Sequence, residues 1–254
     1  MKKFLLTSTS VLLALTILSS CGAEPPIAKE SSAASTEATT IFPVEATPEE
    51  TKNSMNYEAN SAYTQQIERY YTAICNQWDE SAYFDQEMSA MIVYYYEENT
   101  LDNIGYAFMD LDGNNIRELI IGAIKNAELD PLVFEIWTLK HGEPTMLVQS
   151  GSHNRYYLQY SEEDSLWSIS YEAENGAANH AAYNLQIADG NLEVIQGVVF
   201  DAIANENDPW FMTYDLDWDV SNDVPIDEDT ANAVINAGRN TYTAIPYLPY
   251  SQYK

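Results

Sequence analysis

The feature that most constrains the fold is a change in the spacing of the apolar residues near Tyr106. Before this point they recur at intervals of three and four, and after it they alternate with polar residues in short segments separated by turns. The first spacing is typical of amphipathic helices and the second of half-buried strands. Because no crossover helices separate these strands, the sequence predicts an α+β fold containing an antiparallel β meander of roughly seven or eight strands.

The segment before Tyr106 predicts an N-terminal pair of helices, over residues 57–78 and 81–97. The apolar faces of the two helices contain these residues: Tyr63, Ile67, Tyr70, Tyr71 and Ile74 in the first, and Phe84, Met88, Met91, Ile92 and Tyr95 in the second. Cys75 lies in the first helix, and we expect it to be a small buried side chain.

The segment after Tyr106 predicts eight strands, with turns at His141-Gly142, Ser161–Ser165 and Asp189-Gly190. The expected strands are Tyr106–Met109, Leu119–Ile124, Leu132–Leu139, Thr145–Val148, Arg155–Tyr160, Leu166–Tyr171, Tyr183–Ile187 and Leu192–Phe200. Asp-Gly between alternating segments is a strong hairpin sequence. A short C-terminal helix is expected over 227–238, with Asp227 as N-cap and Gly238 as its stop. The apolar segment 245–250 is expected to pack as an extended arm.

The charge of the chain excludes one class of partner. The chain has 39 acidic and 11 basic residues among 254, a formal net charge of −28, and residues 57–254 hold 33 of the acids and 7 of the bases. So few cations cannot neutralise a run of phosphates, so we expect no nucleic-acid partner. With only two cysteines there is no disulfide framework, while a hydrophobic content of 46% is ordinary for a folded domain.

The N-terminus has the pattern of a signal peptide. Lys2 and Lys3 precede a fifteen-residue apolar run, 4–18, which is too short for a comfortable membrane span of ~20 residues. The following Leu18-Ser19-Ser20-Cys21 resembles the lipobox of bacterial lipoproteins. That resemblance implies cleavage after residue 20, lipidation of the Cys21 thiol and anchoring to the outer face of the cell membrane. An ordinary secretory signal is the alternative.

The chain divides into three parts on composition. Residues 1–20 form the lipoprotein signal peptide, 21–56 are rich in Ser, Thr, Ala, Pro and Glu without apolar periodicity, and 57–254 carry the periodic segments. The middle part is typical of a disordered stalk. We therefore expect a single globular α+β domain, 57–254, held off the membrane by this stalk.

The segment 110–118, between two predicted strands, has oxygen-bearing residues at alternating positions. Asp110, Asp112, Asn114 and Glu118 occupy positions 1, 3, 5 and 9, and Ile116 at position 7 can offer its carbonyl. Calcium takes six to eight oxygen ligands at ~2.3–2.6 Å, and a tight loop of this kind can supply them. The segment therefore predicts a structural calcium site. The alternative is a polar turn whose acids are solvated.

This segment resembles the Asp-x-Asp-x-Asp-Gly loops of EF-hand-like and integrin-type repeat proteins, with two departures. Position 6 holds Asn115 where glycine is usual, although Asn tolerates left-handed backbone. Position 12 is Ile121 and not the usual bidentate Glu. A strand-loop-strand site is therefore favoured over an EF-hand.

A second acidic segment follows the last predicted strand. Asp215, Asp217 and Asp219 alternate, with Asn222 and Asp223 after them, and on a strand the first three would share one face. Their mutual repulsion would require a cation or full solvation, and we favour solvation.

A longer stretch resembles uncharacterised secreted proteins and lipoproteins of Gram-positive bacteria. The similarity rests on a strand, an Asp-x-Asp-Gly-Asn loop and Glu-Leu-Ile-Ile-Gly within 103–122, and continues at 137–142, 152–158, 175–178 and 209–211. It implies a shared fold over most of 57–254 and transfers no activity.

The sequence contains no recognisable pattern of catalytic residues. His141, His153 and His180 match no zinc spacing, no nucleotide-binding or nucleophile-elbow motif is present, and Glu172 and Glu174 are one carboxylate pair among many acids. Nineteen Tyr and five Trp instead favour a surface that binds an extracellular protein or glycan. The best candidates for this surface are Tyr94, Tyr95, Tyr96, Arg155, Tyr156 and Tyr157. The alternative is that half of each run faces the core.

The function predicted from sequence is thus a cell-surface lipoprotein that acts as a non-enzymatic binding or scaffolding module, with a calcium-stabilised acidic loop. The alternative is an extracytoplasmic hydrolase that acts on cell-wall glycan or peptide.

Overall fold

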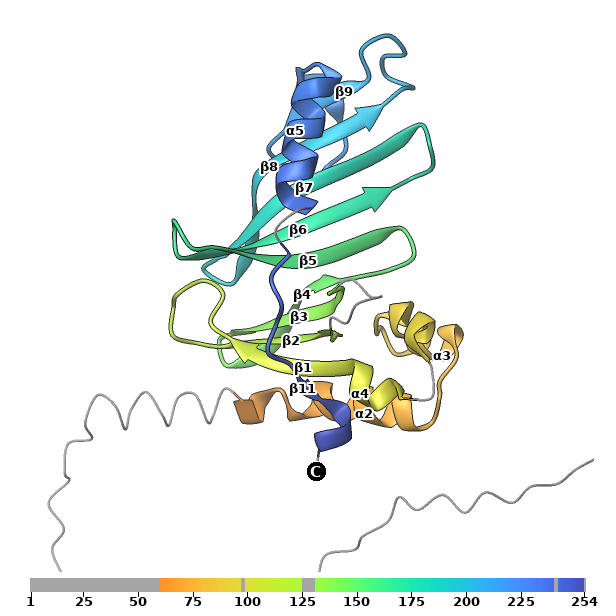
Figure 1. Cartoon of the computed structure of the whole chain (residues 1–254), viewed down its shortest axis with the longest axis vertical. Coiled ribbons are helices and arrows are strands. Elements are labelled where there is room, and N and C mark those ends of the chain that lie inside the picture. The colour runs from red at the N-terminus through yellow and green to blue at the C-terminus, as the bar shows by residue number, and fades with distance from the viewer. Residues whose placement is uncertain (1–59, 97–98, 125–130, 240–241, 254) are drawn as a thin grey trace, which may run out of the picture. The chain divides into compact units, whose positions relative to one another are not determined.

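The structure is a computed structural model that describes residues 60–96, 99–124, 131–239 and 242–253, all within the unit Glu45–Lys254. The predicted signal peptide, Cys21 and the stalk lie outside the described residues. Antiparallel strands dominate the described part and a few helices accompany them, so the fold is α+β (Figure 1).

The sheet contains eleven strands, more than the seven or eight predicted. The strands are β1 Ile104–Met109, β2 Glu118–Ala123, β3 Val133–Lys140, β4 Glu143–Gln149, β5 Asn154–Ser161, β6 Leu166–Glu174, β7 Asn179–Ala188, β8 Asn191–Asp201, β9 Trp210–Thr213, β10 Val224–Pro225 and β11 Leu248–Pro249. The eight predicted strands correspond to β1–β8. The three others have four, two and two residues, too few to show an alternating pattern.

Most strands pair with their neighbours in sequence, as expected of a meander. The order is β10-β9-β8-β7-β6-β5-β3-β2-β1-β11, with β4 paired to β3 outside this path. The turn at Asp189-Gly190 joins β7 to β8 with φ values of 50° and 70°, as a two-residue hairpin turn with two left-handed residues requires. The chain therefore makes two meanders, joined where Val133 of β3 faces Tyr156 of β5.

The N-terminal helices differ from the prediction. The helices are α2 Thr64–Cys75, α3 Glu80–Asp85, α4 Thr100–Asn103 and α5 Glu228–Arg239, with 3₁₀ helices η1 Ala90–Tyr95, η2 Val220–Asn222 and η3 Tyr250–Gln252. Helix α2 carries the predicted apolar face. The single helix expected over 81–97 is wrong, because Glu87 adopts φ 53° and the chain resumes as η1.

Two further outcomes concern the helix ends. The Cys75 side chain is exposed, so the expectation that it is buried is wrong. The N-cap of α5 is confirmed, since the Asp227 carboxylate accepts a hydrogen bond of 2.7 Å from the backbone N–H of Thr230. The helix includes Gly238 and runs to Arg239, one residue beyond the expected stop.

Two hydrophobic cores lie on opposite faces of β1–β3. Leu119 and Ile121 of β2 face the first core, with Tyr63, Tyr70 and other residues of the N-terminal helices, whereas Ile120 faces the second. The second core also contains residues of the later strands: Leu158, Ile169, Leu185 and Val199. The second core is therefore shared by β1–β3 and by β5–β8, and Asn114 of the 110–117 loop lines one cavity with Asp189 of the β7–β8 turn.

Candidate functional site

The predicted acidic loop connects β1 to β2, and Met109 opposite Glu118 is the last pair of the ladder before it. Gly113 and Asn115 adopt left-handed backbone, with φ values of 74° and 67°. Asn115 thus takes the conformation that glycine usually supplies at that position, as expected. These two residues fold the eight-residue loop back on itself, so that its acids face the end of the strand.

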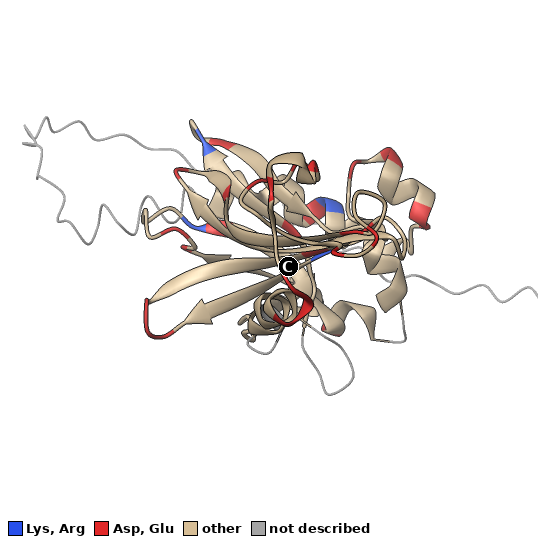
Figure 2. Ribbon diagram, turned by 90° about the horizontal axis from the view of Figure 1, so that it is seen from above, with Lys and Arg blue, Asp and Glu red and all other residues tan. Residues whose placement is uncertain are grey.

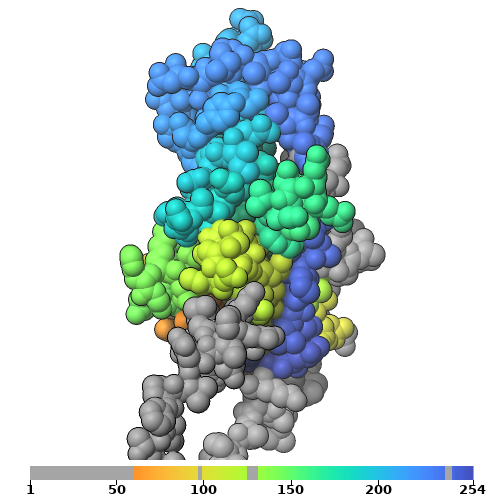
Figure 3. Space-filling view, turned by 90° about the vertical axis from the view of Figure 1, so that its left-hand side faces the viewer, coloured from red at the N-terminus to blue at the C-terminus, as the bar shows by residue number. Residues whose placement is uncertain are grey.

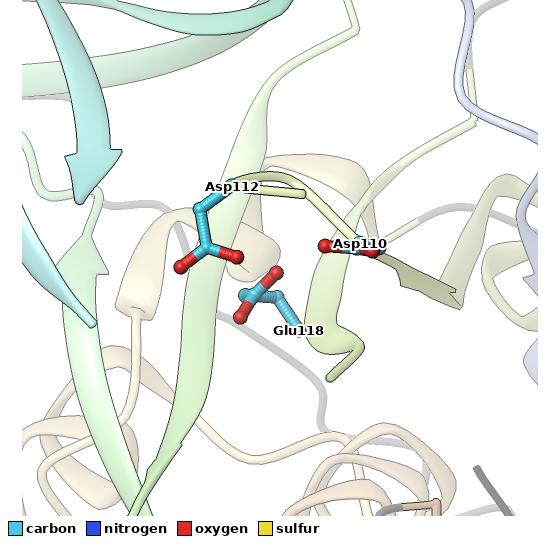
Figure 4. Close-up of side chains that lie close together, drawn as sticks. All are labelled: Asp110, Asp112 and Glu118. Carbon is cyan, nitrogen blue, oxygen red and sulfur yellow. The ribbon is translucent and has the colours of Figure 1, made fainter. Parts of the chain in front are cut away.

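Three carboxylates of this loop come together. One oxygen each of Asp110, Asp112 and Glu118 lies within 4.8 Å of the others, and Figure 4 shows Asp112 and Asp110 on either side of Glu118. Asp110 and Asp112 are half-buried and Glu118 is fully buried. No other group of three or more His, Cys, Asp or Glu in the described ranges has a metal-binding arrangement.

Hydrogen bonds hold each carboxylate in place. Glu118 accepts from the backbone N–H of Leu111 at 2.9 Å and from the Thr138 hydroxyl at 3.0 Å. Asp110 Oδ2 accepts from the Asn115 N–H at 2.9 Å. The other oxygen, Asp110 Oδ1, is buried and has no hydrogen-bond partner. An unsatisfied buried acceptor costs about 1–3 kcal/mol, so this oxygen is the atom of the cluster that most requires a ligand.

The three carboxylates repel one another when all are charged. Two unit charges 4.8 Å apart repel by about 3.5 kcal/mol at an effective dielectric constant of ~20. Three such pairs would approach the whole stability of a typical domain, ~5–15 kcal/mol. Burial raises the pKa of Glu118 to about 7, and burial together with the charge of Asp110 raises the pKa of Asp112. Near neutral pH the cluster therefore requires either a proton or a cation.

The other two predicted ligands belong to the same loop and are exposed. Asn114 donates from Nδ2 to Asp112 Oδ2 at 2.9 Å, and its Oδ1 accepts from the backbone N–H of Ile116 at 2.6 Å. The Asn114 side chain therefore orients Asp112. The structure gives no separate support for Ile116 as a ligand.

A shallow cavity adjoins the loop, where three turns meet. It is lined by Asn114 of the acidic loop, by Lys140 at the end of β3 with His141 of the following turn, and by Asp189 of the β7–β8 turn with Asn191 at the start of β8. Lys140 Nζ donates to Asn191 Oδ1 at 2.8 Å, which ties two of the turns together. Figure 3 shows the loop in yellow and the β7–β8 turn in cyan on one face.

The second acidic segment, 215–223, does not form a strand. Three of its four aspartates instead accept a hydrogen bond from the backbone N–H two residues later: Asp215 from Asp217, Asp217 from Asp219, and Asp219 from Ser221. These three aspartates are exposed. Residues 215–221 are thus a series of Asx turns in which backbone donors and solvent stabilise the charges, whereas burial and the charges of these aspartates raise the pKa of Asp223.

The six candidates for an aromatic surface do not form one surface. Tyr94 is 67% exposed. Tyr95 packs on Phe134, and Tyr96 Oη lies 2.6 Å from Tyr83 Oη. Tyr156 and Tyr157 occupy opposite faces of β5, where Tyr156 stacks on Tyr171 and Tyr157 on Tyr242. Arg155 lies on the Tyr157 side and lines a cavity beneath α5.

That cavity is the feature that sequence reasoning missed. It brings His153 and His180, which 26 intervening residues separate in sequence, beside Glu172 and Glu174, while His141 lies in the cavity at the acidic loop. The register of β5, β6 and β7 places these residues together, and no local pattern encodes that register. The one available indication was the alternation of Glu172 and Glu174 on one strand face.

Comparisons with protein-family models, with curated proteins and with solved structures find no match. Within the described residues, no helix has the length and apolar content needed to cross a membrane.

Proposed function

We propose that this chain is a cell-surface lipoprotein, anchored through a lipidated Cys21, whose domain is a non-enzymatic binding or scaffolding module for an extracellular protein or glycan. The anchor is supported by the signal-peptide pattern and by Leu18-Ser19-Ser20-Cys21. The resemblance of residues 103–122 to secreted proteins and lipoproteins of Gram-positive bacteria, inferred from the sequence pattern, is part of the same proposal.

We further propose that the 110–118 loop of this module binds calcium. The observation that carries this proposal is the buried, unpaired Asp110 Oδ1 within a cluster of three carboxylates. Carboxylate oxygens suit hard cations. An irregular loop suits the flexible geometry of calcium, with its six to eight ligands, better than the strict octahedron of magnesium, which keeps several waters. The bound ion would join the loop to β2 and so stabilise the module.

The test is calorimetric titration of calcium into the EDTA-stripped full chain at pH 7.5. We expect a saturable heat, at least a tenfold weaker one with magnesium, and loss of the calcium heat in Asp110→Asn. Asp208→Asn is the matched control, because Asp208 is an exposed acid outside the cluster.

The outcomes separate the alternatives. If calcium gives no heat in the wild-type chain, the loop is a polar turn stabilised by its own hydrogen bonds. If the heat persists in Asp110→Asn, the ion binds elsewhere, and the Asx turns at 215–223 become the site to test. Either result removes the proposed calcium loop and leaves the proposed anchor untouched.

A further inference from the structure

The cavity beneath α5 lies between this helix and the face of strands β5–β9, with a volume of about 270 Å³. Figure 1 shows α5 across the face of β6–β8. The cavity exists because the strands offer small side chains under the helix. Ala182 lies directly opposite both Glu172 of β6 and Val198 of β8, and Ala231 is the one fully buried residue of α5 over 228–237. The helix therefore touches the sheet at one end of its apolar side and leaves space along the rest.

Register places ionisable and aromatic residues along the walls. Arg155 faces Glu172 across β5 and β6, and Glu174 faces His180 across β6 and β7. Within the described part of the chain, the Arg155 guanidinium takes part in no hydrogen bond or ion pair. Glu172 Oε1 accepts from Tyr242 Oη at 3.3 Å. The sheet wall of the cavity thus offers one acceptor, Glu172, that a hydrogen bond holds in place, and one donor, Arg155, beside it.

Aromatic rings close the end of the cavity nearest the β8–β9 connection. His180 stacks on Phe200 at 4.6 Å, and Trp210 lies at right angles to His180, 5.5 Å away. On the opposite wall, α5 contributes Asn232, Ile235 and Asn236. Amides add donors and acceptors together, and an aromatic ring adds an apolar surface for the C–H groups of a polar ligand.

We propose that this cavity is a binding site for a neutral saccharide of one or two rings. Hydroxyl groups both donate and accept, so they match a cavity whose two walls together offer carboxylates, a guanidinium and amides. The cavity volume of about 270 Å³ is just below the ~300–1,000 Å³ of typical small-molecule sites, so only a small ligand fits. The net charge of −28 opposes the approach of an anion.

The geometry favours binding over hydrolysis. Glycoside hydrolysis requires two carboxyl groups that flank the scissile bond. Glu172 and Glu174 are two residues apart on one strand, so both project from the same wall, with Cα atoms about 6.6 Å apart. The facing wall from α5 holds two amides and an isoleucine and no carboxylate. The inference therefore rests on the proposed function as a binding module, and it names the ligand class.

The test measures binding of maltose, cellobiose and N,N′-diacetylchitobiose to the full chain by saturation-transfer NMR and calorimetry. We expect at least one of them to bind with a Kd below about 1 mM, a modest affinity for a small ligand. Arg155→Ala and Asn232→Ala should each weaken binding about tenfold, by removing one donor. Ala182→Leu should abolish binding by filling the cavity from its floor.

Two exposed residues outside the cavity provide control variants. Arg117→Ala and Tyr214→Ala alter an exposed cation and an exposed ring outside the cavity, and binding should not change. Circular dichroism confirms that each variant is folded. Absence of binding by all three sugars at about 10 mM, or tighter binding of glucuronate, glutamate or lysine, would overturn this inference alone. Release of monosaccharides from a bound disaccharide would overturn the binding-module function as well.

Discussion

Two buried glutamates show how one residue type serves two purposes in the same sheet. Glu135 of β3 accepts hydrogen bonds from the Ser89 N–H at 3.0 Å, from Trp137 Nε1 at 2.8 Å and from Gln149 Nε2 at 3.1 Å. Glu118 of β2 accepts two bonds and faces two aspartates. The hydrogen bonds of Glu135 therefore link the start of η1, β3 and β4. The Glu118 carboxylate, by contrast, is repelled by the carboxylates of Asp110 and Asp112.

The raised pKa of Glu118 predicts a pH-dependent stability in the absence of metal. Its pKa rises from 4.5 to about 7 through burial, so folding favours the protonated form. The stability it contributes is fully present below pH 4.5 and is lost as the pH rises through about 7. A shift of this size corresponds to a loss on the order of 3 kcal/mol.

The measurement is urea unfolding of the full chain in EDTA at pH 5 and pH 8, for the wild type and Glu118→Gln. The free energy of unfolding of Glu118→Gln should decrease less between pH 5 and pH 8 than that of the wild type, because glutamine does not ionise at this position. Calcium should restore wild-type stability at pH 8, since the ion favours the charged carboxylates. Equal pH dependence of the two chains would show that Glu118 is not the titrating group.

At the scale of elements, tertiary contacts decide where the second predicted helix breaks. The backbone N–H of Ser89, which a continuous helix would use internally, bonds to Glu135 Oε1 and to Tyr70 Oη at 3.1 Å. The Ser89 hydroxyl donates to the Ser150 carbonyl at 2.7 Å. The apolar spacing over 81–97 predicted burial correctly for Met88, Met91 and Ile92, but Phe84 is 58% exposed. The segment forms two short helices, α3 and η1, and these do not share one continuous apolar face.

The C-terminal segment behaves as the extended arm that its apolar and proline residues predict. It forms β11 beside β1, with Tyr106 opposite Leu248, and places the fully buried Tyr250 in the first core, 5.4 Å from the Tyr106 ring. The arm thus covers an edge of the sheet and fills the core beneath α2. Its packing should contribute substantially to stability.

Tyr250→Ala should lower the free energy of unfolding by about 3–5 kcal/mol, the usual cost of deleting a buried aromatic ring. Tyr250→Phe is the matched variant, because the Tyr250 hydroxyl is buried without a partner. Its removal should leave stability unchanged or raise it. Urea midpoints of the full chains provide the measurement, and a destabilised phenylalanine variant would contradict this account of the hydroxyl.

At the scale of the whole molecule, the charge is spread over the fold. Figure 2 shows Asp and Glu along many turns and strand ends, with few Lys and Arg among them. Most of these acids remain solvated surface, while 110–118 and the α5 cavity hold the acids for which we propose ligands. If the proposed anchor holds the domain at the cell surface, its charge should keep it away from anionic polymers there unless divalent cations bridge them.

The proposed anchor predicts that lipid labelling and membrane association depend on Cys21 and not on Cys75. In a bacterial host with lipoprotein-processing enzymes, the wild-type chain should incorporate labelled palmitate and sediment with membranes, because two or three acyl chains anchor durably. Cys21→Ser should lose both the label and the membrane association. Cys75→Ser, which alters the exposed cysteine of α2, should keep both. Retention of the label in Cys21→Ser would refute the anchor.

Short-range sequence patterns determined most of the strands, one hairpin, one helix start and the acidic loop of this protein. The alternation after Tyr106 specified β1–β8, Asp189-Gly190 specified a hairpin, Asp227 specified the start of α5, and the spacing of 110–118 predicted an acidic loop that folds back on its strands. Each of these depends on residues that are close in the chain, where backbone preference and side-chain reach act directly.

Only the tertiary structure decided the rest, because the remaining features depend on pairing between distant segments. The register of β5, β6 and β7 brings His153, Glu172 and His180 to one cavity. The Ser89 contact interrupts a helix, and the partners of β9, β10 and β11 convert stretches of two to four residues into strands. Such contacts become favourable only once the sheet has curved around its core, and no local pattern records that geometry.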